Sequence, residues 1–317
     1  MNDSDLDTRL RAVEVSAPGS IGNVGPGLDV LGLAVEGARD SVRAERTSSP
    51  GVLIAESGHP DLPSDPRKHA CGIAAAAVLR RAGAEHIGLR LWVRKGLPLS
   101  AGQGGSAASA AAGAGAANAL LDTPLEPTIL LEAALEAETA VAGRHLDNVA
   151  PSVLGGLVLI RAMDPLDVVS VPVPAGLHIV LVRPEMPLRT ADARRALPRE
   201  IPLDTAIHQM AQVGAIVAAA ASGDLSLLGR AIDDWVAEPA RAPLLPGFVE
   251  AKRAGLEAGA LGCSISGSGP TVFALTDSEA VARVVGDAMR AAYANVGLAC
   301  EIRLTVPDLN GLRVTPA

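Results

Sequence analysis

The segment Gly96–Leu121, GLPLSAGQGGSAASAAAGAGAANALL, combines the most flexible and the most helix-prone compositions in the chain. Gly102, Gly104 and Gly105 fall within four residues, and the run from Ser106 onward is mostly alanine. Glycine permits positive φ and close approach of a ligand, whereas alanine is the strongest helix former. A glycine loop that leads into a helix directs unpaired N–H groups and the positive end of the helix dipole at one point. The segment predicts a phosphate-binding loop, with a mobile linker before a close-packed helix as the alternative.

The length and composition limit the other possibilities. A chain of 317 residues exceeds the usual single domain, so we expect two domains that share a cleft. Hydrophobic residues make up 49% of the chain but aromatic residues only 2%, so aliphatic side chains build the cores and platforms for stacking single-stranded nucleic acid are scarce. A net charge of -8 also argues against a polyanionic partner. We therefore expect no nucleic-acid partner.

The cysteines and the N-terminus indicate the compartment. Cys71, Cys263 and Cys300 form no CxxC pair, which argues against a disulfide framework and a zinc site. The N-terminal sequence MNDSDLDTRLR is acidic and has no apolar core, unlike a secretory signal. The low-polarity run Ser106–Leu121 is too short and too rich in Ala and Gly to span a membrane. We expect a cytoplasmic protein that does not insert into membranes.

Hydrophobic periodicity predicts a mixed α+β chain in two halves that divide between residues 165 and 176. Strands are predicted at 9–17, 88–95, within 155–174, and at 176–184, 271–275 and 301–306. Helices are predicted at 69–82, 106–121, 128–142, 205–221, 225–237 and 279–292, and a short one within the irregular segment 184–202.

One predicted helix carries a carboxylate on its apolar side. Leu131, Leu135 and Ala142 define an apolar stripe, and Glu138 falls on the same stripe. An inward carboxylate must be paired, neutralised or bound to a metal. A Mg²⁺ ion beside phosphates is one partner that would keep it ionised, and a nearby arginine is the alternative.

Three further stretches concentrate polar groups or glycines. SAPGSIGNVGPGLDVLGLAV, from residue 16, predicts a strand that breaks into a glycine turn with Asn23 and Asp29, which would otherwise only bond their own backbone. RHLDNVAPSVLGG, from residue 144, predicts a loop dense in polar groups, among them His145, Asp147 and Asn148. ISGSGP, from residue 265, predicts a second glycine loop before a strand, either at a ligand or as a plain tight connection.

The glycine-rich stretches described above, taken in their order along the chain, resemble the motifs of the GHMP small-molecule kinases. Several details are similar to the homoserine kinases in that family. The most specific are NVGPGLDVLGLAV, HLDNVAPSVLGG, TADARRALP, AEPARAPLLPGF and ISGSGPTVFAL, and the resemblance runs from about residue 13 to 275. It implies a two-domain α+β fold with a shared cleft. Residues 1–168 would form an ATP-binding domain like the second domain of ribosomal protein S5, and residues 169–317 a ferredoxin-like domain.

The resemblance also implies the cofactors. ATP would lie with its triphosphate in the glycine loop, which lacks the GK[ST] of a Walker loop, and Ser106 and Glu138 would be ligands of Mg²⁺. The loop residues implied to bind ATP are Pro98, Leu99, Ser100, Ala101, Gly102, Gln103, Gly104, Gly105, Ser106, Ala107 and Ala108.

The substrate implied by the resemblance is L-homoserine, whose hydroxyl would receive the γ-phosphoryl group on the route to threonine. Arg194 and Arg241 would hold its carboxylate as paired guanidinium forks. Asp29 would meet its ammonium group, with Thr190 and His145 nearby.

Two asparagines, Asn23 and Asn148, would orient the reacting hydroxyl. Phosphoryl transfer requires alignment and charge neutralisation more than covalent help. We favour Asn148 as the orienting group, with Asp147 as the weaker candidate for a base.

The chain departs from the family pattern in three places. The usual GLGSSAA reads GQGGSAA, so Gln103 replaces an apolar residue and Gly105 replaces the first serine. His69 stands where the family would have an asparagine near the adenine.

Two alternative functions stay open: a GHMP kinase for mevalonate-type or sugar alcohols, and a non-catalytic ligand sensor on the same fold. A homodimer is expected from the resemblance alone.

Overall fold

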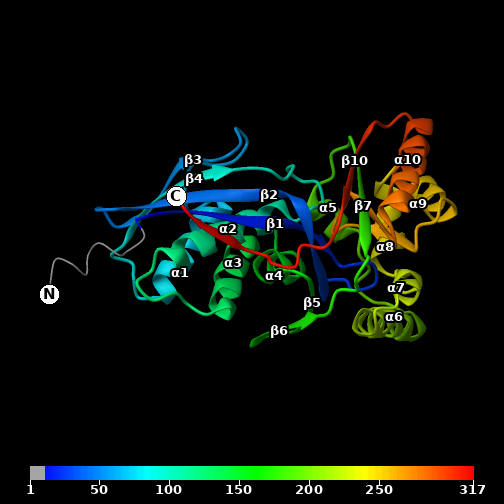
Figure 1. The fold of residues 1–317 in the computed structure, drawn as a ribbon, viewed down its shortest axis with the longest axis horizontal. Coiled ribbons are helices and arrows are strands. Elements are labelled where there is room, and N and C mark those ends of the chain that lie inside the picture. Colours follow the sequence, from blue (N-terminus) through cyan, green and yellow to red (C-terminus); the bar gives the residue numbers. More distant parts are fainter. Residues whose placement is uncertain (1–10) are drawn as a thin grey trace.

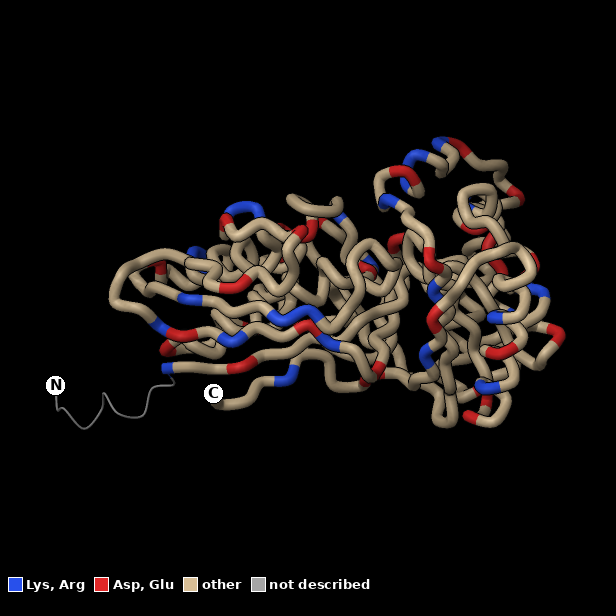
Figure 2. Tube along the Cα trace, turned by 90° about the horizontal axis from the view of Figure 1, so that it is seen from above, with Lys and Arg blue, Asp and Glu red and all other residues tan. Residues whose placement is uncertain are grey.

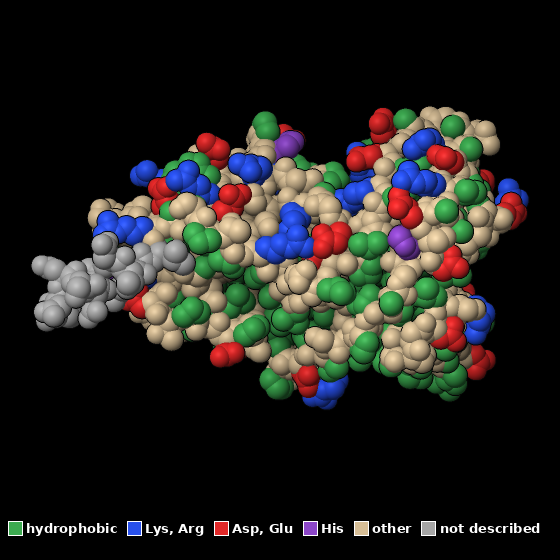
Figure 3. Space-filling model, viewed as in Figure 1, with side chains coloured by type: hydrophobic (Ala, Val, Ile, Leu, Met, Phe, Trp, Pro, Cys, Tyr) green, Lys and Arg blue, Asp and Glu red, His purple; other side chains and the backbone are tan. Residues whose placement is uncertain are grey.

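A computed structural model describes residues 11–317 and shows two lobes lying end to end (Figure 1). The predictions for residues 1–10, which are the start of the first strand and the absence of a signal sequence, lie outside the described residues. Within the part described, no helix combines the length and the apolarity needed to cross a membrane. Acidic and basic residues are interspersed along the chain in both lobes (Figures 2 and 3).

The first lobe is a sheet covered on one face by helices. Its strand order is β11-β1-β2-β4-β3, and β5 pairs with both β2 and β6. The 17-residue strand β2 is central, because it pairs with β1 along its length, with β4 near its end and with β5 near its start. The strands are β1 (Ala12–Gly22), β2 (Leu31–Thr47), β3 (Gly51–Glu56), β4 (Gly88–Arg94), β5 (Leu157–Met163), β6 (Leu166–Val171) and β11 (Arg313–Pro316), and the helices are α1 (Ala70–Arg81), α2 (Gly105–Ala119), α3 (Pro127–Val141) and α4 (Leu146–Leu154).

The second lobe is a four-stranded antiparallel sheet with helices around it. Its strand order is β10-β7-β9-β8. The strands are β7 (His178–Pro184), β8 (Gly262–Ile265), β9 (Val272–Thr276) and β10 (Cys300–Thr305), and the helices are α5 (Thr190–Arg195), α6 (Leu203–Ser222), α7 (Leu225–Arg230), α8 (Ala237–Arg241), α9 (Phe248–Glu257) and α10 (Glu279–Asn295).

Helix α2 lies at the centre of the first lobe. Every residue from Ala107 to Ala117 is buried, so the helix has no solvent face, as its nearly uniform Ala and Gly composition requires. At Gly113 an added Cβ would come within 2.5 Å of the carbonyl oxygen of Cys71 in α1. The small side chains therefore let α1, α3 and β1 approach the α2 backbone closely, which fixes the position of the glycine loop at its start.

The segment 144–156 was predicted as a loop, and this was wrong: Leu146–Leu154 form helix α4. Leu146, Val149 and Val153 recur at helical spacing and are buried in the core. Pro151 lies inside the helix and lacks the N–H that would bond the carbonyl of Asp147. That carbonyl lies against Gly32, where an added Cβ would be 1.9 Å from the oxygen. Tertiary packing thus supports a helix that contains a proline.

The predicted helix at 225–237 was also wrong in its extent, because α7 ends at Arg230 and α8 begins at Ala237. Asp234 provides the reason for the second start: its carboxylate accepts the backbone N–H groups of Val236, Ala237 and Glu238 at 2.8–3.0 Å. The other predicted helices and strands are confirmed with shifted ends, whereas the strands β2, β3, β8 and β11 and the helix α9 were not predicted.

The C-terminal segment returns from the second lobe to the first. Strand β11 pairs antiparallel with β1, from Val13↔Pro316 to Ser16↔Arg313 (Figure 1). The fully buried Asp308 secures this return, since its carboxylate accepts from the guanidinium groups of Arg39 and Arg313 and from two backbone N–H groups. The predicted domain boundary at 168/169 falls within β6 and stays a prediction.

Replacing Asp308 should destabilise the protein strongly. Asp308→Ala leaves two guanidinium groups and two backbone N–H groups without this acceptor, so we expect the free energy of unfolding to fall by about 3–5 kcal/mol in urea titrations. Asp287→Ala is the control, because Asp287 and its partner Arg290 are both exposed, and it should stay within about 0.5 kcal/mol of the parent. Equal effects of the two substitutions would contradict the role of Asp308.

Candidate active site

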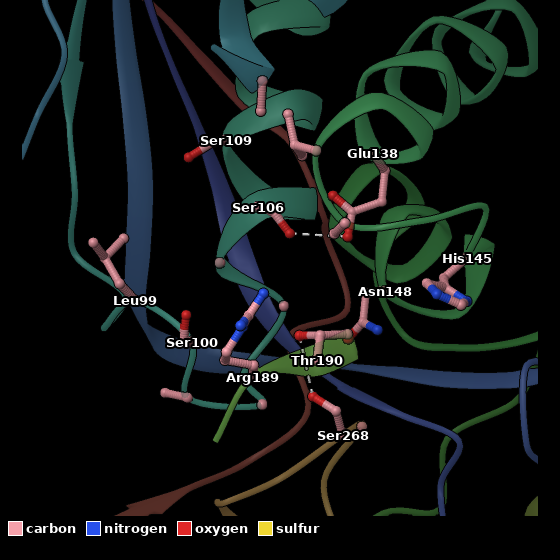
Figure 4. Close-up of a pocket in the computed structure, with 18 of the residues that line it drawn as sticks. Leu99, Ser100, Ser106, Ser109, Glu138, His145, Asn148, Arg189, Thr190 and Ser268 are labelled. Atoms are coloured by element: carbon pink, nitrogen blue, oxygen red, sulfur yellow. Dashed lines mark hydrogen bonds between the residues drawn. The ribbon is translucent and has the colours of Figure 1, made fainter. Parts of the chain in front are cut away.

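A cavity of about 710 Å³ lies where the two lobes meet, and residues of both lobes line it. From the first lobe, the cavity is lined by the glycine loop, the start of α2, the end of α3 and the first turn of α4. From the second lobe, it is lined by α5, Arg241 and the loop after β8. Figure 4 shows Ser106, Glu138, His145 and Asn148 on one side of this space, facing Arg189 and Thr190.

The glycine loop has the backbone conformation that its sequence predicts. Gly102 and Gly104 have φ values of 70° and 69°, and α2 begins immediately afterwards at Gly105. No side chain in the described part of the chain caps the start of α2. The first N–H groups of the helix, where the helix dipole is positive, are therefore available to an anion.

The loop is anchored to the second lobe by side chains in and directly after the second glycine loop. The hydroxyl of Ser266 donates to the carbonyl of Gly102 at 2.6 Å, and that of Thr271 donates to the carbonyl of Ala101 at 2.5 Å. The amide of Gln103, the residue that departs from the family pattern, donates to the Thr271 hydroxyl at 3.2 Å. A polar side chain is thus accommodated at this position of the loop.

Ser106 and Glu138 lie together, as predicted. The Ser106 hydroxyl donates to Glu138 Oε1 at 2.9 Å (Figure 4). Glu138 is 5% exposed, and its Oε2 has no hydrogen-bond partner among the described residues. Burial raises the pKa of Glu138 to about 7, against the opposing effect of the Ser106 hydrogen bond. The inward orientation of Glu138 is confirmed, and the alternative of an arginine partner is wrong.

The donor set around Glu138 fits a cation that brings further ligands with it. Among residues 11–317, no group of three or more His, Cys, Asp or Glu side chains could hold a metal ion. One carboxylate and one hydroxyl suit Mg²⁺ only if phosphate oxygens and water complete its octahedron, which is the usual arrangement at nucleotide sites.

A buried ion pair beneath the glycine loop was missed by the sequence analysis. Lys95 Nζ contacts the Asp40 carboxylate and donates to the Gly105 carbonyl at 2.9 Å and the Ser109 hydroxyl at 3.0 Å. Asp40 in turn accepts the N–H groups of Gly96 and Leu97 at 3.1 Å. The pair joins both ends of the loop, and the position of Lys95 immediately before GLPLS was the signal that could have revealed it.

The opposite end of the cavity holds an acid between two bases. Asp29 accepts from Arg194 at 2.7 and 3.0 Å, and His145 Nδ1 lies 3.4 Å from Asp29 Oδ1. Burial alone would raise the pKa of Asp29, but hydrogen bonds from His145 and Arg194 hold it below its ordinary value. The hydrogen bond to Asp29 raises the pKa of His145. The cluster therefore presents opposite charges side by side.

The predicted substrate residues of the second lobe also reach the cavity. Arg241 is buried, and its guanidinium donates to the carbonyls of Gly267 at 2.7 Å and Ala193 at 3.3 Å. The Thr190 hydroxyl lies 3.4 Å from that of Ser268 (Figure 4). Arg189, missed by the sequence analysis, also lines the cavity and makes no ion pair within the described part of the chain.

Asn23, Asp147 and Asn148 form the wall between these two ends. The Asn23 side chain donates to the Gly267 carbonyl at 3.0 Å, and its backbone N–H donates to Asp147 Oδ2 at 3.0 Å. Burial raises the pKa of Asp147 to about 6. Asn148 Nδ2 lies 3.5 Å from Asp147 Oδ1, so the amide and the carboxylate face the same space.

Four residues considered in the sequence analysis have different surroundings. His69 lies at the edge of the cavity and caps α1, where Nδ1 accepts the Cys71 N–H at 3.2 Å, and burial lowers its pKa. The side chain of Gln103 points to Thr271, and those of Ala107 and Ala108 lie in the core, so these three do not line the cavity.

Comparison with known proteins identifies the class. The family model "GHMP kinases N terminal domain" matches residues 69–156, and "GHMP kinases C terminal" matches residues 215–295. The chain therefore belongs to the GHMP kinase family, and the resemblance in fold is confirmed.

Within that family, the chain is similar over nearly its whole length to homoserine kinases. It is 45% identical to the homoserine kinase of Chlorobium phaeobacteroides over 298 residues, which cover 90% of this chain and 92% of that protein. A homoserine kinase structure from Cytophaga hutchinsonii superposes with a TM-score of 0.92 at 40% identity, covering 96% of this chain and 98% of that one. The mevalonate kinase of L. major shares only the fold, at 17% identity and a TM-score of 0.70 over 92% of this chain and 95% of that one.

The raised pKa of Asp147 predicts a pH-dependent stability difference. Between its ordinary pKa of 3.8 and about 6, the folded state holds a proton that the unfolded chain has lost, so the contribution of Asp147 to stability falls as pH rises through this window. Asp147→Asn should therefore stabilise the protein at pH 8, on the order of 2 kcal/mol, and the gain should vanish near pH 4. Urea titrations across this range measure it, with Asp287→Asn as an exposed control. A gain independent of pH would be inconsistent with a buried, titrating Asp147.

Proposed function

We propose that this GHMP kinase is an ATP-dependent homoserine kinase that makes O-phosphohomoserine for threonine synthesis. The observation that carries the proposal is that one cavity contains both an uncapped helix start behind a glycine loop and the Asp29–Arg194 charge pair. The first suits a polyphosphate. The second suits a small zwitterion, because an α-amino acid has its ammonium and carboxylate groups similarly close together.

The nucleotide half of the site would hold MgATP. The triphosphate would lie along the glycine loop and the first N–H groups of α2, and Arg189, which lines the same cavity, would add positive charge. Ser106 and Glu138 would hold Mg²⁺, whose charge neutralises the phosphates when it is bound. The orphaned buried oxygen of Glu138 supports this assignment, since it has no other partner among the described residues.

The amino-acid half would hold L-homoserine. Asp29 would receive the ammonium group, with His145 and Thr190 beside it, and the guanidinium groups of Arg194 and Arg241 would hold the carboxylate. The fixed fork of Arg241 is already oriented by two backbone carbonyls, which reduces the entropy lost on binding.

Between these halves, the homoserine hydroxyl would attack the γ-phosphorus of ATP. A bond forms from the hydroxyl oxygen to phosphorus, the bond to the β,γ-bridging oxygen breaks, and ADP leaves with that electron pair. Asn23 and Asn148 would orient the hydroxyl, and its proton would pass to the phosphoryl group or to Asp147. The pKa of Asp147, raised by burial to about 6, is compatible with a base, although we favour Asn148 as the principal group.

The two arginines distinguish homoserine from other alcohols. Arg194→Ala and Arg241→Ala should each raise the homoserine KM by about 10- to 100-fold, because a charged hydrogen bond to the carboxylate is lost, while the ATP KM stays near the parent value. Arg195→Ala is the matched control: Arg195 is the neighbouring residue, is exposed and pairs with Asp192. If all three variants keep the parent homoserine KM, the amino-acid assignment is wrong.

Glu138 should govern the requirement for Mg²⁺. Glu138→Gln removes the anionic ligand while keeping its shape, so we expect at least about a tenfold rise in the Mg²⁺ concentration for half-maximal rate, together with a lower kcat. Glu136→Gln on the same helix is the control, because Glu136 forms its ion pairs with Arg80 and Arg81 at the surface. An unchanged Mg²⁺ dependence in Glu138→Gln would show that the metal binds elsewhere.

Coupled release of ADP with homoserine, mevalonate, galactose and shikimate decides among the alternatives. Turnover of homoserine alone supports the proposal. Preference for mevalonate or a sugar indicates the related kinases, and no turnover with any of them indicates a ligand sensor. The cytoplasmic location and the homodimer stay predictions from the sequence.

A further inference from the structure

Ser20 connects three parts of the site that are distant in sequence. It lies near the end of β1 and is 1% exposed. Its hydroxyl donates to Asn148 Oδ1 at 2.9 Å, across 128 residues of sequence. Its backbone N–H donates to the carbonyl of Gln103 in the glycine loop at 3.1 Å. Ser20 therefore contacts both the loop and the first turn of α4.

Two glycines enclose this contact so closely that the amide of Asn148 has little freedom. A Cβ at Gly104 would lie 2.1 Å from the Ser20 hydroxyl oxygen and 3.1 Å from Asn148 Oδ1. A Cβ at Gly22 would lie 2.6 Å from both Asn148 Nδ2 and Asp147 Oδ2. The absence of side chains at these two positions leaves just enough room for the hydroxyl and the amide.

Ser20 and Asp147 together set which end of the amide is available to the cavity, because the hydroxyl holds the amide in place and the carboxylate favours its N–H₂ end. With Oδ1 occupied by the hydroxyl, Nδ2 is the group beside Asp147 Oδ1, at 3.5 Å. A rotation of the amide by 180° would place its oxygen against the Asp147 carboxylate instead, which is an electrostatic repulsion. Asn148 thus presents a donor in the part of the cavity between Thr190 and His145 (Figure 4).

We infer that Ser20 is a positioning residue for phosphoryl transfer, and this inference rests on the proposed function. Its hydroxyl holds Asn148 so that Nδ2 donates to one lone pair of the acceptor hydroxyl oxygen. The other lone pair is then directed at the γ-phosphorus, and the hydroxyl proton points towards Asp147 or a phosphoryl oxygen. Such alignment acts in the transition state more than in substrate binding, so its loss should lower kcat rather than raise KM.

A double-mutant cycle between Ser20 and Asn148 tests the inference. Ser20→Ala should lower kcat about tenfold, with both KM values within about twofold of the parent. In an Asn148→Ala background, the same substitution should change kcat less than about twofold, because Ser20 acts through the amide. Ser20→Cys keeps a weaker donor of similar size and should lose less activity than Ser20→Ala. A tenfold loss in both backgrounds, or a loss confined to KM, would overturn the inference.

Ser152→Ala is the structural control. Ser152 is fully buried in α4 and donates to the carbonyl of Pro18 in β1 at 3.0 Å, so its loss removes a comparable bond between the same elements. It should lower stability without lowering kcat. A kcat loss in Ser152→Ala equal to that in Ser20→Ala would show that loosening of α4 explains both. If Ser20→Ala does not fold, Ser20→Cys, a weaker donor of similar size, takes its place in the cycle.

Substrate turnover by the wild-type protein distinguishes failure of this inference from failure of the proposed function. An alcohol other than homoserine as the preferred substrate overturns only the homoserine assignment, and the cycle is then measured with that alcohol. No turnover of any alcohol overturns both. Homoserine turnover with additive effects of the two substitutions overturns the role of Ser20 alone.

Discussion

The two lobes are joined by a contact between two glycine turns, and the active site depends on it. Gly102 lies so close to the second turn that an added Cβ would be 2.6 Å from the carbonyl oxygen of Ser266 and 2.7 Å from that of Gly269. Hydroxyls of Ser266 and Thr271 then bond the carbonyls of the first turn. Because the first turn contributes only its carbonyls to these two bonds, the cavity side of the loop stays open to a ligand. The same turn receives Asn23 and Arg241 at the carbonyl of Gly267, so the contact also places the substrate residues.

Two acidic side chains at the site are paired with basic residues, and two others are not. Asp40 is fully buried but is neutralised by Lys95, and Asp29 is paired with Arg194. Glu138 and Asp147 form no such ion pair within residues 11–317, and burial raises the pKa of both. In the proposed complex, each of these acids faces a ligand that relieves its burial: Mg²⁺ at Glu138 and the substrate hydroxyl at Asp147. The cost of burying them in the unliganded protein is then offset only on binding, as is common at sites arranged for catalysis.

Local patterns predicted the parts of the fold and site that depend on neighbouring residues. The apolar stripe located Glu138 on the inner face of α3, and the glycines before the alanine run located the loop before α2. Contacts between distant segments could not be predicted in this way. Helix α4 accommodates Pro151 because the carbonyl that the proline leaves free lies against Gly32 of β2, and Asp308 helps to return the chain so that β11 pairs with β1. The role of Ser20 could not be predicted for the same reason, since its partner Asn148 is 128 residues away in the sequence.

Glycine at position 105, where the resemblance leads us to expect a serine, affects how the loop can bind an anion. A Cβ there would lie 3.3 Å from the Pro98 carbonyl oxygen, which is a tight contact, and 3.5 Å from Lys95 Nζ. With glycine at this position, Ser106 supplies the only side-chain hydroxyl of the first turn of α2, and that hydroxyl already bonds Glu138. Anion binding must therefore depend more on backbone N–H groups and on nearby cations than it would in a relative with two serines. Lys95, which bonds the Gly105 carbonyl directly, lies where it can hold those N–H groups in place.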